Sequence, residues 1–442
     1  MNIFRKKNIY LDYASATPLD KAVVKKVAFY EQKFFANPTS IHEKGVEVRK
    51  VIDESRSKIA KLINAHSDEI IFTGSGTESD ALAILGTIKN YELRMKNESA
   101  EYKIPHIITT KIEHPAVLEN CRMLEERGEA EVSYISVDRF GIVNLEELKD
   151  SLKKNTILVS VMYANNEIGT IQPIEEIAKI IRHFKKIKPE NQKGFFGSSD
   201  EGGRGARPLK NLSDFPDSSN FPLFHTDACQ AMNYLFTENI EKLGVDLMSF
   251  NSSKIYGPKG IGILYKKRNI TLSPLYKGGG QESGLHSGTE SVSLIAGVAE
   301  ALSIASKIKQ KESERLTKIR DYGIEKLLSL SKTSGYKIVL NGSLEVRLPN
   351  NINISISGIS SELLVVELSA RGIFVSEKSA CKSDDQNESY VISSIRKICT
   401  KKDGEVEGSL RISLGRDTKK EDMDSLFVAL KNIFEKYKKF KV

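Results

Sequence analysis

The feature that most constrains the fold is an alternation of short apolar runs with longer amphipathic stretches over the first two-thirds of the chain. Runs rich in β-branched residues predict buried strands at 69–74, 106–110, 156–163, 222–228 and 245–250. Apolar positions at helical spacing predict helices at 44–63, 78–89, 114–127 and 173–186. This order predicts an α/β fold with a mostly parallel sheet, covered on both faces, whose ligands bind at the carboxyl ends of the strands.

The last third of the chain has a different pattern. The order of predicted elements is a long helix (290–331), strands near 337–341 and 352–356, a helix (360–371), a loop (376–389), a strand (409–415) and a closing helix (419–438). We therefore expect a large domain over 20–280 and a smaller α+β domain over 281–442, with residues 1–19 packing on the smaller one.

One stretch does not have the composition of a core. Residues 187–221 are rich in Gly, Ser, Pro, Asp, Asn and Lys, so they cannot bury enough apolar surface to offset the entropy lost on ordering. We predict a mobile surface insertion there.

Composition excludes several classes of protein. Hydrophobic residues make up 40% of the chain, enough for a sizeable core, yet no apolar run reaches the roughly 18 residues of a membrane span. The start, MNIFRKKNIY, lacks the apolar segment of a signal peptide, which favours a cytoplasmic protein. The net charge of +8 is spread along the chain without interleaved aromatic residues, so we expect no nucleic-acid contact, although an acidic partner protein would fit.

The four cysteines lie far apart, without the spacing of a metal site, and are expected to be reduced thiols. Cys121 and Cys399 are interpreted as small core residues. Cys381 differs, because its surroundings, SEKSACKSDDQNES, are polar, whereas a structural cysteine prefers an apolar setting. The neighbouring lysines favour its reactive thiolate form, while the pair of aspartates that follows opposes it.

An amine and a carboxylate are predicted at the same edge of the sheet. Lys254 follows the strand at 245–250, and Asp227 ends the strand before it. A lysine in a loop is more often a surface residue. Together, however, the two groups suit pyridoxal phosphate (PLP), because a lysine can hold its aldehyde as a Schiff base and a carboxylate can keep its pyridine nitrogen protonated.

The segment TGSGTES (73–79) has the composition of a phosphate cradle. It joins a predicted strand to a predicted helix, so that backbone N–H groups and the Thr77 hydroxyl could face a phosphate. Taken alone, an ordinary helix cap with Thr77 as the cap residue is the simpler interpretation.

Ten segments in order then extend the pattern over nearly the whole chain. They are YLDYASATP (10–18), NPTSIH (37–42), FTGSGTESD (72–80), EHPAVLENC (113–121), NNEIGTIQPI (165–174), HTDACQA (225–231), KIYGPKGIG (254–262), GGGQESGLHSGTES (278–291), SACKS (379–383) and SLRISLGR (409–416). In these segments the chain resembles the cysteine desulfurases, in the class V aminotransferase branch of the fold-type I PLP enzymes. The resemblance implies a seven-stranded sheet in the large domain.

The resemblance also implies roles for single residues. The cofactor would be held by Lys254, Asp227, Gln230, Gly76, Thr77, Asn166, Asn251, Ser253 and Thr289, with His114 stacked on its ring and available for proton transfer. Thr289 would reach the phosphate of a neighbouring subunit, which implies a homodimer. Arg411 would bind the substrate carboxylate, helped by Asn166. Simpler alternatives are a helix-start histidine at 114, a turn at 166 and an exposed charge at 411.

The implied reaction converts L-cysteine to L-alanine and leaves sulfur as a persulfide on Cys381, for transfer to acceptor proteins of iron–sulfur assembly or tRNA thiolation. Two alternatives stay open at this point. One is another class V enzyme, such as an aminotransferase or a selenocysteine lyase. The other is a non-catalytic scaffold protein, suggested by Asn251, Ser253, Ser283 and His286, which stand where the family usually has Ser, His and two arginines.

Overall fold

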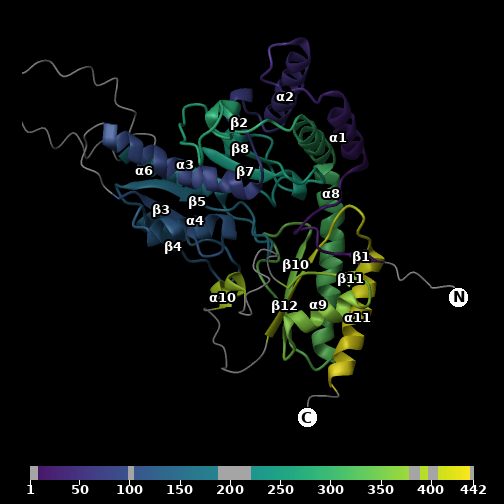
Figure 1. Ribbon diagram of the computed structural model, residues 1–442. Coiled ribbons are helices and arrows are strands. Elements are labelled where there is room, and N and C mark those ends of the chain that lie inside the picture. The colour runs from purple at the N-terminus through teal and green to yellow at the C-terminus, as the bar shows by residue number, and fades with distance from the viewer. Residues whose placement is uncertain (1–7, 98–103, 188–220, 378–388, 397–406, 439–442) are drawn as a thin grey trace, which may run out of the picture.

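The largest element of the fold is a seven-stranded sheet of order β2-β8-β7-β6-β5-β3-β4, seen in the upper part of Figure 1. The structure is a computed structural model that describes residues 8–97, 104–187, 221–377, 389–396 and 407–438. The strands are β2 (Ile70–Thr73), β3 (His106–Thr110), β4 (Glu131–Ile135), β5 (Thr156–Ser160), β6 (Leu223–Asp227), β7 (Leu247–Asn251) and β8 (Gly262–Lys266). Only the pairs that include β8 are antiparallel, so the predicted mostly parallel sheet is confirmed.

Both faces of this sheet are buried, because neighbouring residues of one strand join different cores. Phe72 belongs to a core with α2 (Glu43–Leu62), whereas Ile71 belongs to a core with α3 (Gly76–Asn97) and α4 (Pro115–Glu126). The remaining helices of this part are α1 (Lys21–Lys33), α5 (Leu145–Asp150), α6 (Ile174–Ile187) and α7 (Ile240–Leu243). Burial on both sides explains why most of these strands read as continuous apolar runs.

A second, antiparallel sheet of order β12-β10-β9 lies below the first in Figure 1. The elements of this part are α8 (Val292–Thr333), β9 (Ile338–Leu340), β10 (Asn351–Ser357), α9 (Ser361–Ser369), β11 (Ile373–Phe374), α10 (Tyr390–Arg396), β12 (Glu407–Ser413) and α11 (Lys420–Lys438). Helix α8 packs on α1 and α2 beside the large sheet and on α11 beside the small one, so it connects the two parts.

The N-terminal segment joins the second part before it reaches the first. Strand β1 (Ile9–Tyr10) pairs in parallel with β11, and the Tyr13 N–H donates to the Ser413 carbonyl. Ile9 and Leu11 are buried in the core of the small sheet. The domain boundaries at 19 and 280 stay predictions.

Besides β1, β11, α1, α5 and α7, three further elements were not predicted from the sequence. Strand β4 lies at the sheet edge and is mostly half-exposed, so it shows no continuous apolar run. Strand β8 is short and begins with a glycine. Helix α10 is also short, and it adjoins the predicted 376–389 loop, of which 378–388 lie outside the described residues. Among the helices the structure describes, none has the length and apolar character needed to cross a bilayer.

Candidate active site

A cavity of about 160 Å³ lies at the carboxyl ends of the parallel strands. The predicted site residues that line it are Gly76, Thr77, His114, Asn166, Asp227, Gln230, Asn251, Lys254 and Arg411. The lining residues that the sequence analysis missed are Ala14, Ser15, Asp80, Met162, Ala164 and Cys229. A larger, more open hollow of about 890 Å³ lies nearby, but its arginines are engaged, since Arg416 pairs with Asp20 and Arg315 with Glu312. The smaller cavity is therefore the candidate active site.

One end of the cavity is the start of helix α3. The cap is Ser75, whose Oγ accepts the Glu78 N–H at 3.1 Å, while a Glu78 carboxylate oxygen accepts the Gly74 N–H at 2.7 Å. The interpretation of Thr77 as the cap residue is therefore wrong, because the helix begins at Gly76 and Thr77 lies in its first turn. A Cβ on Gly76 would lie 3.0 Å from both Asn251 Nδ2 and Cys229 Sγ. The glycine thus keeps open a cradle of the kind that a phosphate needs.

Asp227 ends β6 at the base of the cavity, and its Oδ1 accepts the Cys229 N–H at 2.8 Å. Beside it, burial and the charge of Asp227 hold the pKa of Asp80 well above its usual range. Burial also lowers the pKa of His225 to about 4, and its two ring nitrogens lie 2.8 Å from Ser160 Oγ and 2.9 Å from Ser249 Oγ. The raised pKa of Asp80 favours its neutral form, which limits the negative charge beside Asp227.

Glu113 is a further buried acid, and it supports a pH prediction. Burial raises its pKa to about 8, although Met162 N–H and the Thr110 hydroxyl donate to it. Between pH 4.5 and 8 the folded chain therefore holds a proton that the unfolded chain has lost, so stability falls as pH rises through this window. We expect Glu113→Gln to remove about 3 kcal/mol of that fall between pH 5 and 7.5, measured by urea unfolding.

The control for this pH prediction is Glu119→Gln, on the surface of the neighbouring helix α4, which should leave the pH dependence unchanged. Parallel stability curves for wild type and Glu113→Gln would contradict the prediction.

Lys254 lies in a short 3₁₀ turn, Ser252–Lys254, directly after β7. Its Nζ donates to the carbonyl of Ser15, and Gln230 Nε2 donates to the carbonyl of Ala14 at 3.0 Å. Ala14 and Ser15 therefore form a wall of the cavity. The segment YLDYASATP is the signal that could have revealed this wall, but no role had been assigned to it.

His114 and Asn166 have structural contacts as well as positions in the cavity. His114 is the cap of α4, where its Nδ1 accepts the Ala116 N–H at 3.1 Å. The helix-start interpretation is therefore confirmed alongside the cavity position, and a ring proton is directed to Nε2. The backbone carbonyl of Asn166 accepts from Arg411 Nη1 at 3.3 Å.

Arg411 is not an exposed charge, because its side chain is only 1% accessible. Its Nη2 donates to Asp12 Oδ1 at 2.9 Å and to Ser15 Oγ at 2.5 Å. Strand β12 places this guanidinium at the cavity, where it forms an ion pair with Asp12.

Two predicted residues of the described part of the chain, Ser253 and Thr289, do not line the cavity. Ser253 donates to Asn251 Oδ1 at 3.2 Å, and its carbonyl accepts from the Thr17 hydroxyl. Thr289 is exposed and lies apart from the cavity of its own chain. Cys381 lies outside the described residues, as does Cys399, whereas Cys121 is fully buried as predicted.

The residues that flank segment 378–388 form hydrogen bonds with residues next to the cavity. On one side, Ser376 exchanges two backbone hydrogen bonds with Arg411, at 3.2 and 2.7 Å. On the other side, Ser389 Oγ donates to Glu167 at 2.5 Å, and the Tyr390 hydroxyl donates to the Glu113 carbonyl at 2.6 Å. Glu167 and Glu113 directly adjoin the cavity residues Asn166 and His114.

Comparison with known proteins agrees with this geometry. The family model of the class-V aminotransferases matches residues 9–188 and 202–426. The cysteine desulfurase IscS of Dictyoglomus turgidum is 40% identical over 434 residues, covering 98% of this chain and 95% of the relative. The chain belongs to the cysteine desulfurases of the class-V aminotransferase family. The family resemblance seen in the sequence is thereby confirmed.

Other members of the family support the same assignment. Cysteine desulfurase IscS 1 of Archaeoglobus fulgidus is 36% identical over 427 residues, and the alignment covers 97% of this chain and 97% of the relative. A solved structure titled NifS-like protein has a TM-score of 0.77 at 31% identity, covering 97% of this chain and 99% of its own. The structure of SspA in complex with cysteine has a TM-score of 0.67 at 28% identity, covering 92% and 98%.

Proposed function

We propose that this cysteine desulfurase takes sulfur from L-cysteine with PLP held by Lys254, and that it carries the sulfur away on Cys381. The observation that supports this most strongly is the meeting of Lys254, Asp227 and the buried Arg411 in one cavity. An amine, a carboxylate and a guanidinium there match, in turn, the aldehyde of the cofactor, its ring nitrogen and the carboxylate of an amino acid.

The residues around the cavity fit the cofactor. The cradle at Gly76 and Thr77 would hold the phosphate, with Asn251 and Ser253 as further donors beside it. Asp227 would pair with the pyridine nitrogen, His114 would lie on the ring face, and Gln230 and Asn166 would contact the ring oxygen and the substrate side. When bound, PLP supplies an electron sink that makes the Cα proton acidic and weakens the Cβ–S bond.

The side chains of the protein do the remaining work. Arg411 orients the substrate by its α-carboxylate, the amine of Lys254 removes the Cα proton, and His114 Nε2 is available for proton transfer. The Cys381 thiolate attacks the substrate sulfur. Overall, the enzyme thiol and L-cysteine give an enzyme persulfide and L-alanine. The Cβ–S bond of the substrate breaks, an S–S bond forms, and Cβ gains a proton.

The attachment of the chain on both sides of 378–388 supports this role for Cys381. The preceding residues are bonded to Arg411, and the following ones to the neighbours of Asn166 and His114. The described residues on both sides of the segment that carries Cys381 thus have their contacts beside the cavity.

We further propose a homodimer in which Thr289 reaches the partner's phosphate. This is supported by the exposure of Thr289 outside its own cavity, and by apolar side chains available for a contact, since Ile41 is 99% and Phe35 is 83% exposed. The persulfide would pass to acceptor proteins of iron–sulfur assembly or tRNA thiolation. We assign this chemistry to the cytoplasm, where thiols stay reduced.

The test is incubation of the purified chain with PLP, L-cysteine and a thiol reductant. We expect equal amounts of L-alanine and sulfide. Turnover of a non-thiol amino acid without alanine formed from cysteine, or turnover of selenocysteine alone, would favour another class V enzyme. An absence of cofactor absorbance together with a stable partner complex would favour the scaffold alternative.

A further inference from the structure

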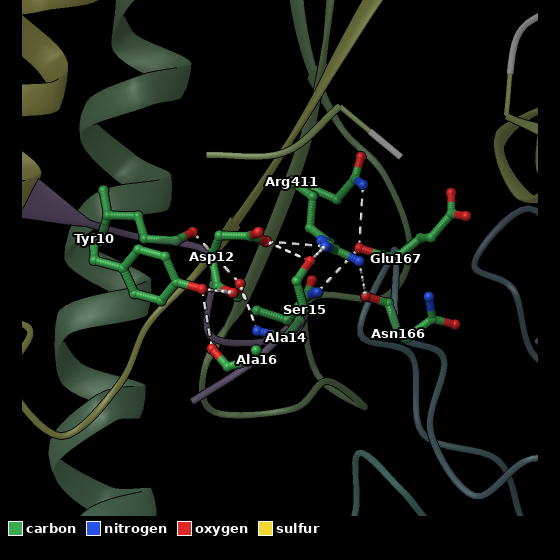
Figure 2. A network of polar contacts seen from close by, with 12 residues as sticks. Tyr10, Asp12, Ala14, Ser15, Ala16, Asn166, Glu167 and Arg411 are labelled. Carbon is green, nitrogen blue, oxygen red and sulfur yellow. Dashed lines mark hydrogen bonds and ion pairs between the residues drawn. The ribbon is translucent and has the colours of Figure 1, made fainter. Parts of the chain in front are cut away.

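Arg411 is already paired with a carboxylate of the protein itself. Figure 2 shows Asp12 and Ser15 reaching its guanidinium from the N-terminal segment, while the Asn166 carbonyl approaches from the other side. Ser15 Oγ also donates to Asp12 Oδ1 at 2.9 Å, and the Tyr10 hydroxyl donates to the carbonyls of Asp12 and Ala16 at 3.0 Å each. These hydrogen bonds of Tyr10 and Ser15 shape the turn that presents the Asp12 carboxylate to Arg411.

This pairing uses the nitrogen that a second carboxylate would need. A guanidinium clasps a carboxylate through two neighbouring nitrogens, either Nε with Nη2 or Nη1 with Nη2. Both edges include Nη2, which donates to Asp12 and to Ser15. The buried Nε has no hydrogen-bond partner among the described residues. A two-point clasp of a ligand therefore requires that Asp12 or Ser15 release Nη2.

We propose that Asp12 is a resident counter-ion of Arg411, which the α-carboxylate of the amino-acid substrate displaces when it binds. The inference rests on the proposed function. Without substrate, Asp12 neutralises a guanidinium that is 1% exposed, and Ser15 holds the pair together. When substrate binds, its carboxylate meets the like charge of Asp12, so Asp12 lowers affinity for the carboxylate while it stabilises the empty site.

The test uses Asp12→Asn, which keeps an oxygen acceptor for Arg411 and Ser15 but removes the charge. We expect L-alanine, the product, to bind about tenfold more tightly to the PLP-loaded variant than to PLP-loaded wild type. Binding is measured by the change in cofactor absorbance as L-alanine is added. Ethylamine, which is alanine without its carboxylate, should bind equally to both proteins. The unliganded variant should melt at a lower temperature than wild type, and L-alanine should raise its midpoint by more.

A purely structural role for Asp12 would lower the melting temperature without tightening L-alanine binding, and that result would overturn the proposal, as would unchanged binding. If Asp12→Asn does not fold, Ser15→Ala tests the same point, because it frees one Nη2 hydrogen while keeping the ion pair. We expect about threefold tighter L-alanine binding in that variant, and no gain would be evidence against the proposal. Failure of the proposed function is distinguishable, since it would appear in wild type as no alanine formed from cysteine.

Discussion

Replacing Lys254 by alanine is expected to remove the cofactor's visible absorbance band and to lower alanine formation from L-cysteine by at least about 1,000-fold. The side chain is the amine that lines the cavity between Asp227 and the carbonyl of Ser15. Its loss removes both the covalent attachment of PLP and the base for the Cα proton. Absorbance spectra with added PLP, and alanine measured by chromatography, test the two effects separately.

The matched control is Lys259→Ala, which removes an exposed lysine five residues later in the same loop. This variant should keep both the absorbance band and the activity. Turnover that survives in Lys254→Ala, or is lost equally in Lys259→Ala, would show that the amine has been misassigned.

Replacing Cys381 by alanine is expected to stop sulfur release, by at least about 100-fold, while the cofactor spectrum stays normal. The reason is that the thiol which receives the sulfur is missing, whereas the cavity that binds PLP is intact. Mass spectrometry after a single exposure to L-cysteine should find the added sulfur, 32 mass units, on the Cys381 peptide of wild type and on no cysteine of the variant.

A second thiol, that of Cys229, lies in the cavity and could also receive the sulfur, so the position of the persulfide distinguishes the two cysteines. Cys229 lines the cavity, and burial raises the pKa of its thiol well above the usual range, as does the charge of Asp227. A protonated thiol is a poor nucleophile, so the persulfide should still form on Cys381 in Cys229→Ala. Sulfur found on Cys229 in the wild type would transfer the proposed role to that residue.

Much of the fold could be predicted because local pattern and tertiary environment agree. The strands β3, β6 and β7 are buried along nearly their whole length, so apolar and β-branched residues make up most of each. Strand β4 could not be found in this way, since its position at the sheet edge follows from pairing with β3 and leaves its own residues mostly half-exposed.

The candidate site was predictable where its residues follow strands that the pattern reveals, as Lys254 and Asp227 do. Asp12 and Ser15 were not predictable from the pattern, because they reach the cavity through contacts with residues almost four hundred positions away, such as Arg411. Asp80 was missed for another reason. The helical pattern around Asp80 does not indicate that its side chain lies beside the buried carboxylate of Asp227.

The course of the N-terminal segment has a consequence for synthesis on the ribosome. Strand β1 and residues 12–14 have their partners in β11 and at Ser413, which are translated several hundred residues later. The large sheet, whose last strand is β8, can form long before that. A nascent chain would therefore possess Lys254 and its phosphate cradle while still lacking Arg411, which belongs to β12. Competence to bind the substrate carboxylate arises only after β12 has been synthesised.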